Sequence, residues 1–99
     1  MAPQFEWDDH NVRQFRAQQI EPAEAEQALL NNPIPVLEQD VEGDVSYLYY
    51  GETNAGRLLS LMVIENENAW RVIMASELNP DQRTDYVQRR ARIAAKLAR

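Results

Sequence analysis

The sequence predicts an α+β fold: a short N-terminal strand, two helices, a four-stranded antiparallel meander and a C-terminal helix. Three helix-start signals support this prediction, at Asp8 or Asp9, at Pro22 and at Asn79 followed by Pro80. Between the second and third signals, four largely apolar segments are separated by short polar or glycine-containing segments. Such a pattern is typical of consecutive strands joined by hairpin turns.

The composition indicates one small cytoplasmic domain spanning residues 1–99. A chain of 99 residues with 44% hydrophobic residues has enough apolar material for a single core. The absence of cysteine excludes a disulfide framework and a thiol nucleophile, and it fits a reducing compartment. The N-terminus lacks a signal-peptide pattern, and the longest apolar run, residues 58–64, is far shorter than the roughly 20 residues of a membrane span.

No cofactor or metal site is expected. The acidic residues lack the spacing of a calcium-binding loop, and no glycine-rich phosphate loop is present. His10 is the only histidine and the natural general base by its pKa. It lies beside two aspartates at the predicted start of a helix, so we expect it to be exposed to solvent.

The N-terminal third predicts a strand followed by two helices. Residues 5–7 alternate as a short strand does. Asp8 or Asp9 can then accept hydrogen bonds from the free backbone N–H groups of a first helix. Pro22 suits the first turn of a second helix, because its missing N–H has no helical partner there. The Asn-Asn-Pro sequence at residues 31–33 ends that helix.

The middle of the chain predicts the meander. Strands are expected at residues 34–37, 45–51, 58–64 and 69–75, with turns at residues 42–44, 53–56 and 65–68. The segment 58–64 is nearly all apolar, which predicts a central strand covered on both faces. Tyr47 and Tyr49 would share a strand face, either as a packing pair or as an exposed binding platform.

The C-terminal helix, about residues 80–98, has the clearest start signal. Asn79 caps it, Pro80 takes the first helical position, and Gln82 completes a capping-box pattern. Arg90 falls within the apolar arc of this helix, so its far end is expected to leave the sheet and meet a partner.

Charge is distributed unevenly along the chain. Residues 1–78 hold 14 acidic side chains and four arginines, whereas residues 79–99 hold six cations and two aspartates. An acidic body repels nucleic acid. The helical spacing places Arg89, Arg92, Lys96 and Arg99 on one stripe. This stripe is the candidate contact for RNA or for a partner protein, and a solvated cationic face near the negative end of the helix dipole is the alternative.

Several segments together resemble the BrnT family of small bacterial toxins, which share a RelE-like ribonuclease fold. They are Phe5-Glu6-Trp7-Asp8, Ile20-Glu21-Pro22, Arg57-Leu58-Leu59, Arg71-Val72-Ile73-Met74-Ala75 and, on the last helix, Tyr86. The similarity covers most of residues 5–86.

The chain departs from the family pattern at polar positions. Where the family usually carries a basic residue, a histidine and a glycine, this chain has Ala17, Gln18 and Gln19. The second arginine of the family's strand motif corresponds to Ser76, and a helix glutamate corresponds to Gln82.

The resemblance implies the toxin component of a type II toxin–antitoxin pair, with a ribbon-helix-helix antitoxin as partner. If the chain is an enzyme, the implied activity is a metal-independent endoribonuclease. Arg71 and Arg57 would then stabilise phosphate charge from adjacent strands, with Tyr86 assisting. The alternatives are that Arg71 pairs with a carboxylate such as Glu6 or Glu77 and that Tyr86 is a core residue.

Two rival hypotheses keep the fold. In the first, the chain is a noncatalytic BrnT-fold binding module that acts through a protein partner, as the acidic body and the altered polar positions favour. In the second, the chain is a homodimer joined through its C-terminal helix.

Overall fold

The computed structural model confirms the α+β class and describes residues 4–41, 43–66 and 69–98. The elements in chain order are β1 (Phe5–Glu6), α1 (Asp9–Ala17), α2 (Pro22–Leu30), β2 (Ile34–Val41), β3 (Asp44–Glu52), β4 (Leu58–Glu65), β5 (Trp70–Glu77) and α3 (Pro80–Leu97). The predicted turns at 42–44 and 65–68 include residues 42, 67 and 68, which lie outside the described residues.

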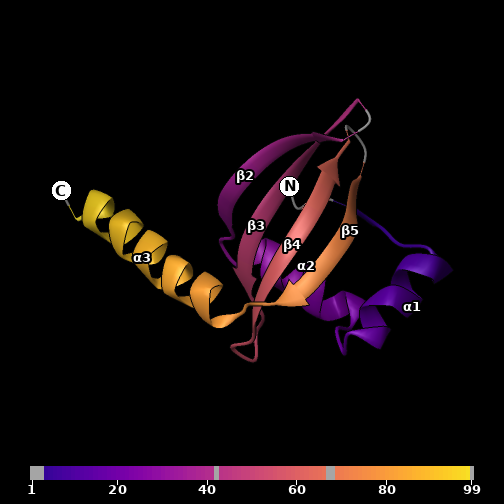
Figure 1. Cartoon of the computed structure of the whole chain (residues 1–99), viewed down its shortest axis with the longest axis horizontal. Coiled ribbons are helices and arrows are strands. Elements are labelled where there is room, and N and C mark those ends of the chain that lie inside the picture. Colours follow the sequence, from indigo (N-terminus) through magenta and orange to yellow (C-terminus); the bar gives the residue numbers. More distant parts are fainter. Residues whose placement is uncertain (1–3, 42, 67–68, 99) are drawn as a thin grey trace.

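The strands form one five-stranded sheet in the order β1-β5-β4-β3-β2. The last four strands are the predicted antiparallel meander, and β1 adds to β5 in parallel through two residue pairs. Figure 1 shows α2 behind the sheet and α3 leaving the body from one end of it.

The helix starts follow the sequence signals. The Asp8 side chain caps α1 by accepting from the Asn11 amide at 2.8 Å. At α3, Asn79 and Gln82 form a reciprocal capping box, with Pro80 at the first helical position. These contacts satisfy backbone donors that a helix start leaves without partners, which explains why local sequence marks these boundaries.

The main core lies between the sheet and the two N-terminal helices. Its buried members are Phe15, Ile20, Ala25, Ala28, Leu29, Leu59, Leu61, Val63, Val72 and Ala75. Gly51 of β3 lets α2 approach closely, because a Cβ at this position would lie 2.4 Å from the Ala28 carbonyl oxygen. Packing of α2 on the sheet therefore requires glycine at residue 51.

Among the described residues, the opposite face of the sheet, which we call the open face, is covered only where α3 begins. A second cluster of Ile34, Tyr50, Leu78 and Tyr86 packs there, with Leu58 of β4 at its margin. The prediction that β4 is covered on both faces is therefore wrong: Met62, in the middle of the strand, is only half-buried on the open face.

Candidate functional site

The outer edge of β5 is paired over only part of its length. β1 pairs with Trp70 and Arg71, and the Asn11 side-chain amide then donates to the Val72 carbonyl at 2.9 Å. The next residue, Ile73, is a bulge, since the register with β4 shifts there. Between Ile73 and Ser76 the strand edge therefore borders α1 instead of another strand.

A pocket of about 500 Å³ lies at this edge, and we call it the α1–β5 pocket. Its walls come from α1, from β5 and from the open face of β3 and β4. They are formed by Gln14, Phe15, Ala17, Gln18, Leu48, Ser60, Met62, Ile73, Met74, Ala75 and Ser76. None of these side chains is ionisable near neutral pH, so the walls supply hydrogen-bonding and apolar groups but no general base and no cation.

The α1–β5 pocket brings together positions that are far apart in the sequence. Ala17 and Gln18 from the end of α1 line it with Ser76 from the end of β5. These are three of the positions at which the chain departs from the BrnT pattern. Sequence reasoning identified the departures but did not predict that they share one pocket.

No protein-family model, curated protein or solved structure matches this chain. The BrnT-like resemblance is therefore still a prediction, and the geometry of the site must carry the functional argument. Within residues 4–41, 43–66 and 69–98, no group of three potential metal ligands comes together. In the same ranges no helix is both long enough and apolar enough to cross a membrane.

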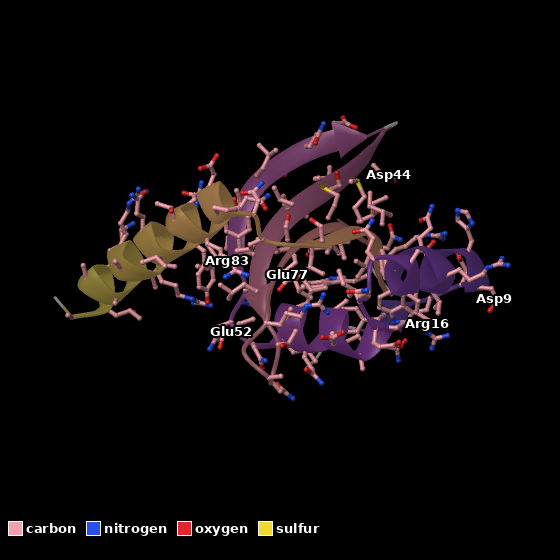
Figure 2. All side chains as sticks on the ribbon, turned by 60° about the horizontal axis from the view of Figure 1, so that its bottom comes forward. Asp9, Arg16, Asp44, Glu52, Glu77 and Arg83 are labelled. Carbon is pink, nitrogen blue, oxygen red and sulfur yellow. The ribbon has the colours of Figure 1, made fainter. Side chains whose placement is uncertain are left out.

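Arg57 is held by three groups at the end of the sheet where α3 begins. It donates to the Gln19 carbonyl at 2.7 Å and to Glu24 at 3.2 Å, and it lies 3.6 Å from Glu77. These contacts connect the residue before β4 to the segment between α1 and α2, to α2 and to the end of β5. Figure 2 shows Glu77 beside Arg83, its second cationic neighbour.

Arg71 lies at the other end of the sheet. Its Nη2 atom donates to Asp8 at 2.6 Å, so the carboxylate partner is Asp8, where the sequence suggested Glu6 or Glu77. The pKa of Asp8 is lowered, first because it accepts from the Asn11 amide and also because of the Arg71 charge. The pair is about half exposed, which leaves the guanidinium accessible from solvent.

The expectation that Arg57 and Arg71 converge on one phosphate is wrong. In the β4–β5 register, Glu77 pairs with Leu59 and Arg71 pairs with Ile64. Arg57, which directly precedes β4, therefore lies near Glu77 at the end of β5. Glu77 is six residues from Arg71, a separation of about 20 Å along an extended strand.

Tyr86 is a buried member of the cluster beneath α3. Its hydroxyl donates to Glu52 at 3.4 Å and accepts from Arg90 Nε at 3.1 Å, while the Arg90 guanidinium carbon lies 5.4 Å from the ring centroid. These contacts fix the first half of α3 on the sheet. Tyr86 lies far from Arg71, so the three predicted catalytic residues do not form one site.

The predicted contact stripe on α3 is mostly solvent-exposed. Arg89 pairs with Asp85 one turn earlier at 3.0 Å. Arg92 and Lys96 lie on exposed turns and form no ion pair with the described part of the chain. Arg99, the fourth member predicted for the stripe, lies outside the described residues.

An apolar row crosses the open face next to the α1–β5 pocket. Adjacent strands pair Leu37 with Leu48, Leu48 with Met62, and Met62 with Met74. Paired residues in a sheet point to the same face, so the four side chains form a continuous row, which we call the open row. Its two ends are the most exposed, with Leu37 at 52% and Met74 at 66%.

The aromatic pair on the helix-covered face is part of a packed series. Tyr49 stacks on Trp70 with ring centroids 6.2 Å apart, and Tyr47 lies beside Tyr49. The Tyr49 hydroxyl donates to Glu65 at 2.5 Å. Burial and this carboxylate raise the pKa of Tyr49. Tyr49 therefore packs against the edge of the core together with Trp70, and Tyr47 packs on Tyr49, as the packing interpretation predicts.

We expect Glu24→Gln to weaken the dependence of stability on acidic pH. The Glu21 amide donates to Glu24, and this bond, with the Arg57 guanidinium, lowers the pKa of Glu24. A glutamate whose pKa is lowered in the folded state stabilises the protein fully above its ordinary pKa of about 4.3. This contribution is lost as the pH falls through the lower, folded-state pKa. In urea unfolding between pH 3 and 7, the free energy of unfolding should fall less steeply toward acidic pH in the variant than in the wild type. Identical pH dependences would contradict this assignment.

Proposed function

We propose that this chain is a noncatalytic, BrnT-like binding module that acts by docking a partner protein on the open face of its sheet. The observation that carries the proposal is the neutral chemistry of the α1–β5 pocket, where Gln18 and Ser76 stand at positions that are basic or histidine in the BrnT family. Cleavage of RNA needs stabilisation of phosphate charge and transfer of a proton, and neither side chain supplies them.

The open row supports a protein as the ligand. Four adjoining apolar side chains on a solvent-facing sheet form a contiguous apolar patch, and such patches mark protein–protein contact sites. Two of the four are methionines, whose flexible side chains adapt to a partner surface. The BrnT resemblance implies a ribbon-helix-helix antitoxin as the partner, so the chain would be the toxin-side component of such a pair.

The two candidate catalytic arginines have structural roles in this proposal. Arg57 joins the β3–β4 hairpin to the N-terminal helices, and Arg71 joins β5 to the cap of α1 through Asp8. Ion pairs of this kind orient segments even where they add little to stability.

The second candidate function is that of a metal-independent endoribonuclease toxin. The observation that favours it is Arg71, whose side chain is 44% exposed and whose only ion-pair partner among the described residues is Asp8. A phosphate could take the place of Asp8 on the planar guanidinium group.

An RNA-cleavage assay on the purified protein separates the two candidates. We expect the wild type to cleave RNA no faster than the Arg71→Ala variant does. The double variant Gln18→His with Ser76→Arg is expected to gain cleavage activity. The double variant places a base and a phosphate-binding cation in the same pocket.

The matched control introduces the same side chains outside the pocket. Asn66→His with Gln88→Arg changes two exposed positions and should give no activity. Cleavage by the wild-type protein that is lost in Arg71→Ala would replace the binding module with the ribonuclease.

A further inference from the structure

The second half of α3 has no covering surface within the described chain. Within the described residues, Arg90 makes the last side-chain hydrogen bond between α3 and the body, donating to the Asn32 carbonyl at 2.6 Å, and residues 91–98 are all exposed. Figure 1 shows this end of the helix extending away from the sheet. Helices in proteins gain most of their stability by packing an apolar face, and residues 91–98 have no such cover from the part of the chain that the structure describes.

The exposed end of α3 carries an apolar face. Tyr86, Arg90, Ile93 and Leu97 follow one another at intervals of three or four residues, so they lie on one side of the helix. Tyr86 uses that side to pack on the sheet, whereas Ile93 is 38% exposed and Leu97 is 82% exposed. The face that binds the sheet at the start of α3 therefore continues, uncovered, to its end.

The chain also carries the complementary surface. The open row offers four apolar side chains on the same side of the sheet as the cluster beneath α3. The helix cannot reach its own open row, because the Asn79 cap and the contacts of Tyr86 and Arg90 fix its direction away from the sheet.

Charge complementarity favours a second copy of the chain as the partner. The described part of α3 holds five cations and two aspartates, whereas residues 1–78 hold 14 acidic side chains and four arginines. The helix of one copy is therefore attracted to the body of another. Because each copy has both surfaces, two copies can bury both by one reciprocal contact, as twofold-symmetric dimers do.

We propose that α3 of a second copy docks its Ile93–Leu97 face on the open row of the first copy. In the same dimer, α3 of the first copy docks in the same way on the open row of the second. The inference rests on the proposed function, in which the open face binds protein, and it names the occupant of that face when the chain is alone. Arg92 and Lys96 lie beside the Ile93–Leu97 face, on one flank of the helix, so they can remain at the solvated rim of the contact.

Disulfide trapping tests the contact directly, because the chain has no cysteine. A Met74→Cys protein mixed with a Leu97→Cys protein should form a mixed disulfide dimer under mild oxidation. Gln88→Cys, an exposed position on another side of α3, is the matched control and should not cross-link to Met74→Cys. A Leu97→Cys protein that cross-links only to itself would indicate a helix–helix pair and overturn the inference.

Light scattering across a range of concentrations tests the dimer in the unmodified protein. We expect a concentration-dependent dimer whose dissociation constant rises roughly tenfold or more in Leu97→Glu or Met74→Glu, since each places an unpaired charge in the contact. Both positions are exposed, so the variants should keep the wild-type circular dichroism spectrum.

A monomer at every concentration, or a dimer that neither glutamate variant weakens, would overturn the inference. Failure of the proposed function has a different signature, which is RNA cleavage by the wild type that Arg71→Ala abolishes. The two failures can therefore be told apart in the same protein preparations.

Discussion

Replacing Gly51 with alanine is expected to lower the free energy of unfolding by about 3 kcal/mol or more, at or above the upper end of the usual cost of overpacking a core. The added Cβ would lie 2.4 Å from the Ala28 carbonyl oxygen and 2.8 Å from its carbonyl carbon. Both atoms belong to the backbone of α2, so no side-chain rotation can relieve the contact. Urea unfolding followed by circular dichroism measures the loss.

Gly56→Ala is the matched control for this prediction. Gly56 has a φ of +88° and no atom within 4 Å of an added Cβ, so alanine there meets only backbone strain. That strain costs roughly 1–2 kcal/mol. A loss at Gly51 no larger than the loss at Gly56 would mean that α2 can shift away from β3 without penalty.

The fold could be predicted from the sequence where local chemistry determines structure. Asp8, Pro22 and Asn79 mark helix starts because a cap or a missing N–H acts within one helical turn. The strand from Ile34 was predicted to end at residue 37 but continues to Val41. Its polar second half looks like a turn in the sequence, although an edge strand can expose polar side chains while its backbone pairs with β3.

The candidate site could be predicted only in part. The two arginines were expected to meet because they lie on adjacent strands, but in a meander the start of one strand lies beside the end of the next. That rule alone separates Arg57 from Arg71. The α1–β5 pocket depends instead on the bulge at Ile73 and on the short pairing of β1, and no local sequence signal predicts either feature.

Replacing Phe15 with alanine is expected to cost about 3–5 kcal/mol of unfolding free energy, the range for a buried aromatic side chain. Phe15 is 2% exposed, and its ring packs edge to face on that of Trp7, with the ring centroids 5.3 Å apart. A small domain has a total stability of only about 5–15 kcal/mol, so this loss would remove a large fraction of it. Thermal and urea unfolding both measure it.

Met74→Ala is the control, because Met74 lines the same α1–β5 pocket but is mostly exposed and should change stability by about 0.5 kcal/mol or less. Equal losses at the two positions would contradict the division of the pocket into a buried floor and an exposed rim. If the division holds, the floor belongs to the core and cannot vary without unfolding the domain. The rim at Met74 is then the part of the pocket where side chains can change to suit a partner while the fold stays intact.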